Sequence, residues 1–83
     1  RSADAAVGTI TVYFTSWFDL DVFMGKDVVL SAPGLGLDSR LHDGHHQIRC
    51  LRAGVSSHVS ISTNPPEWVK YDVTCKHDQG TAN

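Results

Sequence analysis

Hydrophobic and polar residues alternate along several short segments of the chain. Near the beginning, Ile10, Val12 and Phe14 alternate with threonine and tyrosine. Further along, Val59 and Ile61 alternate with serine and histidine. A period of two places every second side chain on one face of an extended backbone, and β-branched and aromatic residues favour strands. The pattern therefore predicts β-strands with one buried face.

Other segments have the composition of short strands. The last of them has an apolar phase of Val69, Tyr71, Val73 and Cys75. The predicted strands outside the two alternating segments are residues 18–23, 28–30, 47–51 and 68–75.

Between these strands the sequence predicts connections. Residues 24–27 have the composition of a turn. Residues 63–66 contain two prolines, which lack the amide N–H of a central strand and predict a rigid link. Residues 31–46 carry no clear period and predict a long loop, with a short helical turn around residues 39–42. Because long loops are uncommon in compact domains, this loop is a candidate functional element.

The predicted elements give an all-β fold with one domain. The 83 residues suffice for a single domain, and we expect a small β-sandwich or barrel of about six short strands. Residues 1–7 and 77–83 are expected to be flexible tails.

The two cysteines indicate how such a small domain is stabilised. Cys50 and Cys75 are the complete cysteine complement, and an even number in a small domain is consistent with one disulfide. The alternative is a pair of buried free thiols in a cytosolic protein. A disulfide predicts a secreted, extracellular protein, and the start at Arg1 fits removal of a leader.

Composition and charge exclude some functions. The formal net charge of −2 offers no basic face for a nucleic-acid partner. No apolar run approaches the roughly 18 residues that a membrane-spanning helix requires. The sequence implies no cofactor.

Part of the chain resembles the βγ-crystallin pattern. The resemblance rests on residues 50–61, which contain the pair Ser56-Ser57 before an apolar strand, and on Trp68 and Tyr71 in the following strand. It implies a crystallin-like structural domain that would dimerise to cover an open sheet edge. The positions of the family's calcium ligands hold Arg52 and Ala53, so the resemblance implies a lost calcium site. In size, strand content and few disulfides, the chain also loosely resembles small secreted fungal effectors and killer toxins.

A cluster of histidines is the main candidate for chemistry. His42, His45 and His46 lie beside Asp43, and imidazoles can bind Zn²⁺, Cu²⁺ or Ni²⁺. Their spacing matches no standard zinc motif, and adjacent residues point to opposite faces of a strand. We therefore favour no metal site on sequence grounds and interpret the cluster as a solvated loop.

Three catalytic interpretations are less well supported. A ribonuclease-like enzyme could use these histidines or His58 with Glu67 and Arg49, but Glu67 directly follows two prolines. A serine hydrolase would need a motif around Ser57 that is missing from the sequence. A paired-carboxylate site could use Asp19 and Asp21, which would lie about 7 Å apart on one face of a strand. We interpret this face as solvated.

The tryptophans favour a binding function. Trp17 and Trp68 are out of phase with the neighbouring apolar residues Phe18 and Tyr71, so we expect both indoles to point outward. Exposed tryptophans frequently anchor partners. We therefore expect a non-enzymatic, effector- or toxin-like domain that recognises a protein or carbohydrate surface through Trp17, Trp68, His45 and His46. The alternative is a small metal-dependent or ribonuclease-like enzyme that uses the histidines.

Overall fold

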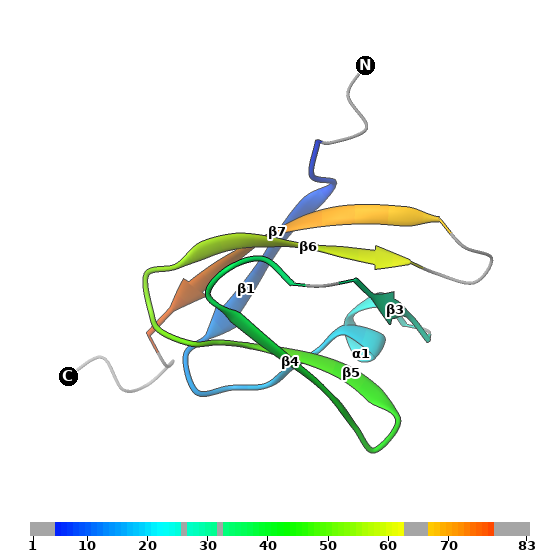
Figure 1. Ribbon diagram of the computed structural model, residues 1–83, viewed down its shortest axis with the longest axis horizontal. Coiled ribbons are helices and arrows are strands. Elements are labelled where there is room, and N and C mark those ends of the chain that lie inside the picture. Colours follow the sequence, from blue (N-terminus) through cyan, green and yellow to red (C-terminus); the bar gives the residue numbers. More distant parts are fainter. Residues whose placement is uncertain (1–4, 26, 32, 63–66, 78–83) are drawn as a thin grey trace.

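The computed structural model describes residues 5–25, 27–31, 33–62 and 67–77, and its strands form two sheets (Figure 1). The first sheet has the order β1-β7-β6-β3, and the second has the order β2-β5-β4. The seven strands of the described residues are β1 (Gly8–Tyr13), β2 (Phe18–Asp19), β3 (Val29–Leu30), β4 (Leu37–His42), β5 (His45–Cys50), β6 (Ser56–Ser62) and β7 (Trp68–Lys76). The predicted all-β fold is confirmed.

The core lies between the two sheets and follows the alternation of the strands. Ile10 and Val12 of β1, Val59 of β6 and Val73 of β7 point inward from the first sheet and are at most 1% exposed. Ile48 of β5 meets them from the second sheet and is fully buried. Burying an aliphatic side chain of this size contributes roughly 1.5–3 kcal/mol. The periodicity that predicted strands thus also identified much of the core.

The prediction of a strand over residues 18–23 is wrong beyond its first two residues. The chain leaves β2 at Asp19 and forms a short helix, α1 (Leu20–Met24). Asp19 is the N-cap, because its carboxylate accepts a hydrogen bond of 2.9 Å from the Val22 N–H. Gly25 ends the helix with a φ of 74°, which glycine adopts without steric cost. Both capping residues are visible in the sequence and outweigh the apparent alternation.

The predicted long loop is also wrong in part. Residues 37–42 form β4, which pairs with β5 in an antiparallel hairpin where His42 lies opposite His45. Asp43 and Gly44 form the two-residue turn, with φ values of 51° and 78°. Positive φ at both positions is the geometry that Asp-Gly provides in tight hairpins. The expected helical turn around residues 39–42 is therefore a strand, and the connection before β4 is short.

Several other expectations concern the connections and the termini. Val7 donates a backbone hydrogen bond of 2.8 Å to Lys70, which ties the end of the expected amino-terminal tail to β7. Residues 63–66 and 78–83 lie outside the described residues. Among the residues that the structure describes, no helix is long and apolar enough to cross a membrane.

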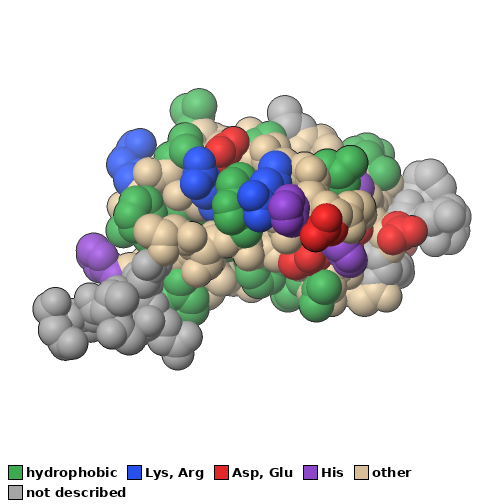
Figure 2. Space-filling model, turned by 90° about the horizontal axis from the view of Figure 1, so that it is seen from below, with side chains coloured by type: hydrophobic (Ala, Val, Ile, Leu, Met, Phe, Trp, Pro, Cys, Tyr) green, Lys and Arg blue, Asp and Glu red, His purple; other side chains and the backbone are tan. Residues whose placement is uncertain are grey.

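The outer face of the three-stranded sheet is mostly polar. Along β4 and β5, the pairs Asp38–Arg49, Arg40–Gln47 and His42–His45 lie opposite one another in register. Figure 2 views the molecule from the side of β4 and β5 and shows basic, histidine and acidic side chains gathered there around hydrophobic ones.

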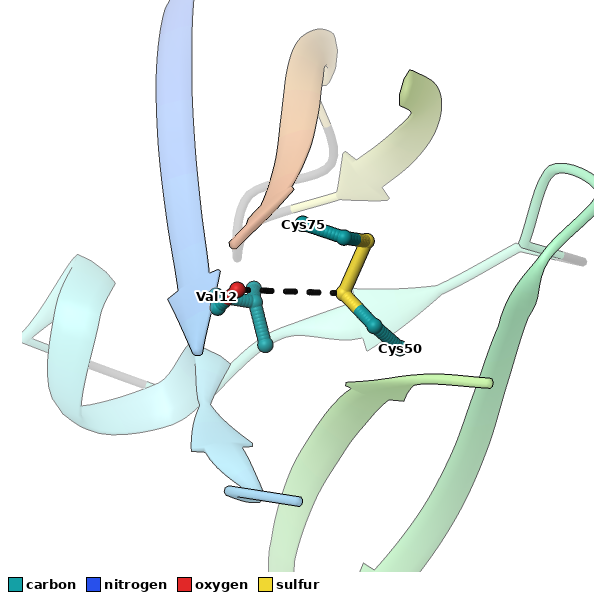
Figure 3. The surroundings of a disulfide bond; sticks show 3 residues. All are labelled: Val12, Cys50 and Cys75. Carbon is teal, nitrogen blue, oxygen red and sulfur yellow. Dashed lines mark hydrogen bonds between the residues drawn. A yellow bond between two sulfur atoms is a disulfide. The ribbon is translucent and has the colours of Figure 1, made fainter. Parts of the chain in front are cut away.

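A disulfide joins the two sheets near the ends of β5 and β7. Cys50 ends β5 and Cys75 lies near the end of β7; their Cα atoms are 5.9 Å apart and both residues are buried (Figure 3). The carbonyl oxygen of Val12 in β1 lies 3.9 Å from the Cys50 sulfur. A disulfide sulfur carries no hydrogen, so we treat this as a packing contact. The bond confirms the pairing of the two cysteines and fixes the second sheet to the first.

Candidate functional site

Two aspartates and two histidines meet where β2, α1 and the β4–β5 hairpin converge. Asp19 is paired with Gln47 in β5, which brings the start of α1 beside the start of that strand. His45 and His46 are the first two residues of β5 and follow the tight turn directly. The hairpin therefore delivers both imidazoles to the carboxylates of Asp19 and Asp21.

Asp21 is the most unusual member of this group, because its side chain is only 4% exposed. Its Oδ1 accepts a hydrogen bond of 2.9 Å from the His46 backbone N–H and lies 3.2 Å from the His46 Nδ1 atom. Its Oδ2 is buried and has no hydrogen-bond partner among the described residues. A buried polar atom without a partner costs about 1–3 kcal/mol, and more for a charged group. The interpretation of this aspartate as a solvated strand residue is wrong, since it is a buried residue of α1.

His45 faces both carboxylates from the solvent side. Its Nδ1 lies 3.5 Å from Asp19 Oδ2 and 4.0 Å from Asp21 Oδ2, and its side chain is 46% exposed. One ligand atom from each of these three residues lies within 4.8 Å of the others. His45 and His46 leave β5 on opposite faces, as expected for a strand, yet both approach Asp21, which lies in the first turn of α1 where this helix packs against β5.

The pKa of the Asp19 carboxyl reflects its surroundings. Burial raises this pKa, but the backbone hydrogen bond from Val22 lowers it, as do the Gln47 side chain, the nearby His45 and the Asp21 backbone. The interactions that lower the pKa outweigh burial, so the pKa of Asp19 lies below the usual value for an aspartate, and the carboxylate is charged at any pH above this lowered pKa.

A second cluster lies beside the first on the outer face of the same sheet. The Arg40 guanidinium lies 4.0 Å from the centre of the Trp17 ring, and the Arg49 guanidinium lies 4.7 Å from it. Such cation–π contacts are favourable by about 0.5–1 kcal/mol at exposed sites. We call these three residues the Trp17 platform.

Each arginine of the Trp17 platform is also held by a neighbouring strand residue. Arg40 Nε donates a hydrogen bond of 2.7 Å to Gln47 Oε1. Arg49 Nη2 lies 3.3 Å from Asp38 Oδ2. The platform is therefore fixed from β4 and β5 before any partner arrives.

The two tryptophans do not share one surface. Trp68 is 56% exposed on β7 of the four-stranded sheet, whereas Trp17 directly precedes β2, is half-buried and contacts arginines of the three-stranded sheet. Phe18 and Tyr71 pack against the core. The Phe23 ring lies between theirs, with its centroid 5.4 Å from the centroid of each. An aromatic surface that combines all four residues is therefore not formed.

The catalytic interpretations do not gain a common site. His58 lies on β6 of the four-stranded sheet, while Arg49 lies on β5 of the other sheet. His58 and Asp72 are opposite in register and line an open groove of about 410 Å³ together with Ser57. Among the described residues, no hydrogen bond or ion pair connects these three side chains. A nucleophile with an oriented base is thus missing from this groove.

The third histidine of the sequence cluster stays apart from the carboxylates. His42 is exposed at the end of β4, and its Nε2 lies 3.6 Å from Asp43 Oδ2. In the described part of the chain, the group with metal-binding geometry contains His45 and the two aspartates, without His42 or His46. The sequence suggests a group of histidines beside Asp43, whereas the structure pairs His45 and His46 with Asp19 and Asp21, which lie far from them in the sequence.

Comparison with known proteins gave no match to a family model, to a curated protein or to a solved structure. The resemblance to the βγ-crystallin pattern therefore stays a prediction.

Proposed function

We propose that this protein is a secreted, disulfide-stapled β-domain that acts by surface recognition, in an effector- or toxin-like role without enzymatic activity. The observation that carries the proposal is the Trp17 platform, an indole contacted by two restrained guanidinium groups on a sheet surface. Tryptophan and arginine are enriched among the residues that dominate binding energy at protein interfaces.

The restraint of the platform supports this function. Association costs free energy for every mobile side chain that must be ordered, about 0.5–1.5 kcal/mol for each. Arg40 and Arg49 are already positioned by Gln47 and Asp38, so less of this cost remains for binding. The platform also lies on strands, and the Cys50–Cys75 disulfide fixes those strands to the rest of the domain.

The chemistry of the platform favours a protein partner. The Asp38 carboxylate pairs with Arg49, whereas Arg40 is bonded to the neutral side chain of Gln47, which leaves positive charge beside an apolar ring. We expect the partner to present an apolar side chain beside a carboxylate, because arginine pairs with carboxylates through two parallel hydrogen bonds. A carbohydrate partner is the alternative outcome of the test.

Site-specific crosslinking tests this proposal. A photoreactive residue replaces His42, which is exposed beside the platform, and in a control protein it replaces the exposed Asp72 on the other sheet. Both proteins are exposed to extracellular fluid from the protein's natural source, and crosslinked partners are quantified by mass spectrometry. We expect a protein that is captured from position 42 and not from position 72.

The dependence on the platform is then measured with the captured protein. Trp17→Ala and Arg40→Gln are expected to weaken its binding at least tenfold. Trp68→Ala serves as the matched control, because it removes an indole from the other sheet. Capture that is unaffected by Trp17→Ala and Arg40→Gln would refute the platform, and capture abolished by glycosidase treatment would identify a carbohydrate ligand instead.

A further inference from the structure

We infer that Asp19, Asp21 and His45 form a binding site for one divalent transition-metal ion, of which Zn²⁺ is the type. This site is separate from the Trp17 platform and does not depend on the proposed recognition function. It also differs from the histidine-only cluster that the sequence suggested, since two of its three ligands are carboxylates.

The candidate ligand atoms lie at distances from one another that suit a single ion. A tetrahedral ion with bonds of about 2.0–2.1 Å keeps its ligand atoms about 3.4 Å apart. His45 Nδ1 lies 3.5 Å from Asp19 Oδ2 and 4.0 Å from Asp21 Oδ2. These two distances are close to that value, and all three candidate ligand atoms lie within 4.8 Å of one another, so modest side-chain movements would bring them to one ion.

The buried oxygen of Asp21 supports the same site. Oδ2 has no hydrogen-bond partner among the described residues, although the side chain is only 4% exposed. The His45 Nδ1 atom lies 4.0 Å from this oxygen, which is too far for a hydrogen bond. A cation bound to this oxygen would satisfy it, whereas without a cation the atom carries the cost of burial alone.

His46 has a positioning role in this arrangement. Its backbone N–H and ring contact Asp21 Oδ1, on the other side of the carboxylate from the candidate ligand. Such contacts in the outer shell fix the orientation of a metal-binding carboxylate. The side chain of Asp21 is therefore held with Oδ2 directed into the cluster before the ion binds.

The ligand set determines the class of ion. One imidazole and two carboxylates suit Zn²⁺ and similar first-row ions, whereas Ca²⁺ takes six to eight oxygen ligands. Three protein ligands leave a fourth position, which water can occupy because the His45 side chain is 46% exposed. The two negative charges of the aspartates balance the charge of a divalent ion.

The test is the binding of Zn²⁺ or Co²⁺ alone to the intact oxidised protein. We expect one ion per chain by isothermal titration calorimetry with Zn²⁺, and a visible absorption band of four-coordinate Co²⁺ that Zn²⁺ abolishes. We also expect a thermal shift with Zn²⁺ that EDTA reverses, because a ligand of the native state stabilises it.

Three variants identify the ligands. His45→Gln and Asp19→Asn are expected to weaken Zn²⁺ binding at least tenfold. Asn remains a good N-cap, so Asp19→Asn removes the charge and keeps the helix signal. His42→Gln is the matched control, since it removes an exposed imidazole of the same hairpin, and it is expected to change the affinity by less than twofold.

Circular dichroism confirms that each variant is folded before its affinity is interpreted. The inference is overturned if the native protein binds no Zn²⁺ at 100-fold excess over protein. It is equally overturned if binding survives both His45→Gln and Asp19→Asn, or if His42→Gln weakens it as much as they do.

Discussion

Breaking the bond between Cys50 and Cys75 should remove a large share of the stability of this domain. The bond spans 25 residues of sequence and links β5 of one sheet to β7 of the other. In the chain-entropy model, a closed loop of that length destabilises the unfolded state by about 3.5 kcal/mol. A domain of this size has a total stability of about 4–12 kcal/mol, so the reduced protein should be marginally folded.

The assays are thermal and urea unfolding of the oxidised and the reduced protein, each monitored by tryptophan fluorescence. Reduction keeps both sulfur atoms in the core, so the comparison isolates the covalent link from changes in packing. We expect a midpoint of thermal unfolding about 14–28 °C lower after reduction. The Cys50→Ala/Cys75→Ala variant is the control and should be less stable still, because it also leaves a cavity between the sheets. A loss of less than about 1 kcal/mol on reduction would refute the reasoning, since the unfolded chain would then gain little freedom from losing the link.

Two further predictions concern single residues of the loops and caps. Because the pKa of Asp19 is lowered in the folded protein, its charged form stabilises the fold fully above the usual carboxyl pKa, and this contribution is lost as the pH falls through the lowered value. The native protein and Asp19→Asn should therefore differ more in free energy of unfolding at pH 7 than at pH 2.5. A difference that is the same at both pH values would contradict the direction of this pKa shift. Gly36 has a φ of 87°, and a Cβ there would lie 2.5 Å from Val55 Cγ1. Gly36→Ala should therefore lower the free energy of unfolding, measured in urea, by more than about 1 kcal/mol. Gly44 has a similar φ but open space around it, so Gly44→Ala should lower the free energy of unfolding by less.

The sequence predicts the strands that have a clean alternation and a buried face. In β7 every second residue from Val69 to Cys75 is apolar, and Val59 and Ile61 share one face of β6, so the burial of Val59, Ile61 and Val73 follows directly from the period of two. The pairing of Cys50 with Cys75 also follows, because there is only one way to pair two cysteines. These elements needed no information about their neighbours in space.

The sequence reasoning failed where short local signals competed with weak periodicity. The Asp-Gly turn at residues 43–44 marks a hairpin, yet β4 alternates Leu37 and Leu41 with polar residues on an exposed edge and has little apolar signal. Asp19 and Gly25 mark the ends of a helix of only five residues, which is too short to show a period of its own. Local turn and cap chemistry decided both segments.

The candidate site depends on contacts that no local pattern reveals. Asp21 and His46 are 25 positions apart and meet because the hairpin and α1 pack together. Trp17 meets Arg40 and Arg49 for the same reason, through the pairing of β2 with β5. The residue types of the site could be recognised in the sequence, but their grouping required the topology.

The position of β1 in its sheet has a consequence for how the protein is made. β1 lies at the sheet edge, and its strand partner is β7, with which it pairs in parallel from Gly8 opposite Tyr71 to Tyr13 opposite Lys76. A ribosome therefore synthesises β1 long before its partner exists, and Cys50 likewise waits for Cys75. Pairing between such distant segments is slow, since the entropy of closing the intervening chain is lost first. The core should therefore close only after β7 has emerged, and until then the first strand stays open to chaperones or to wrong partners.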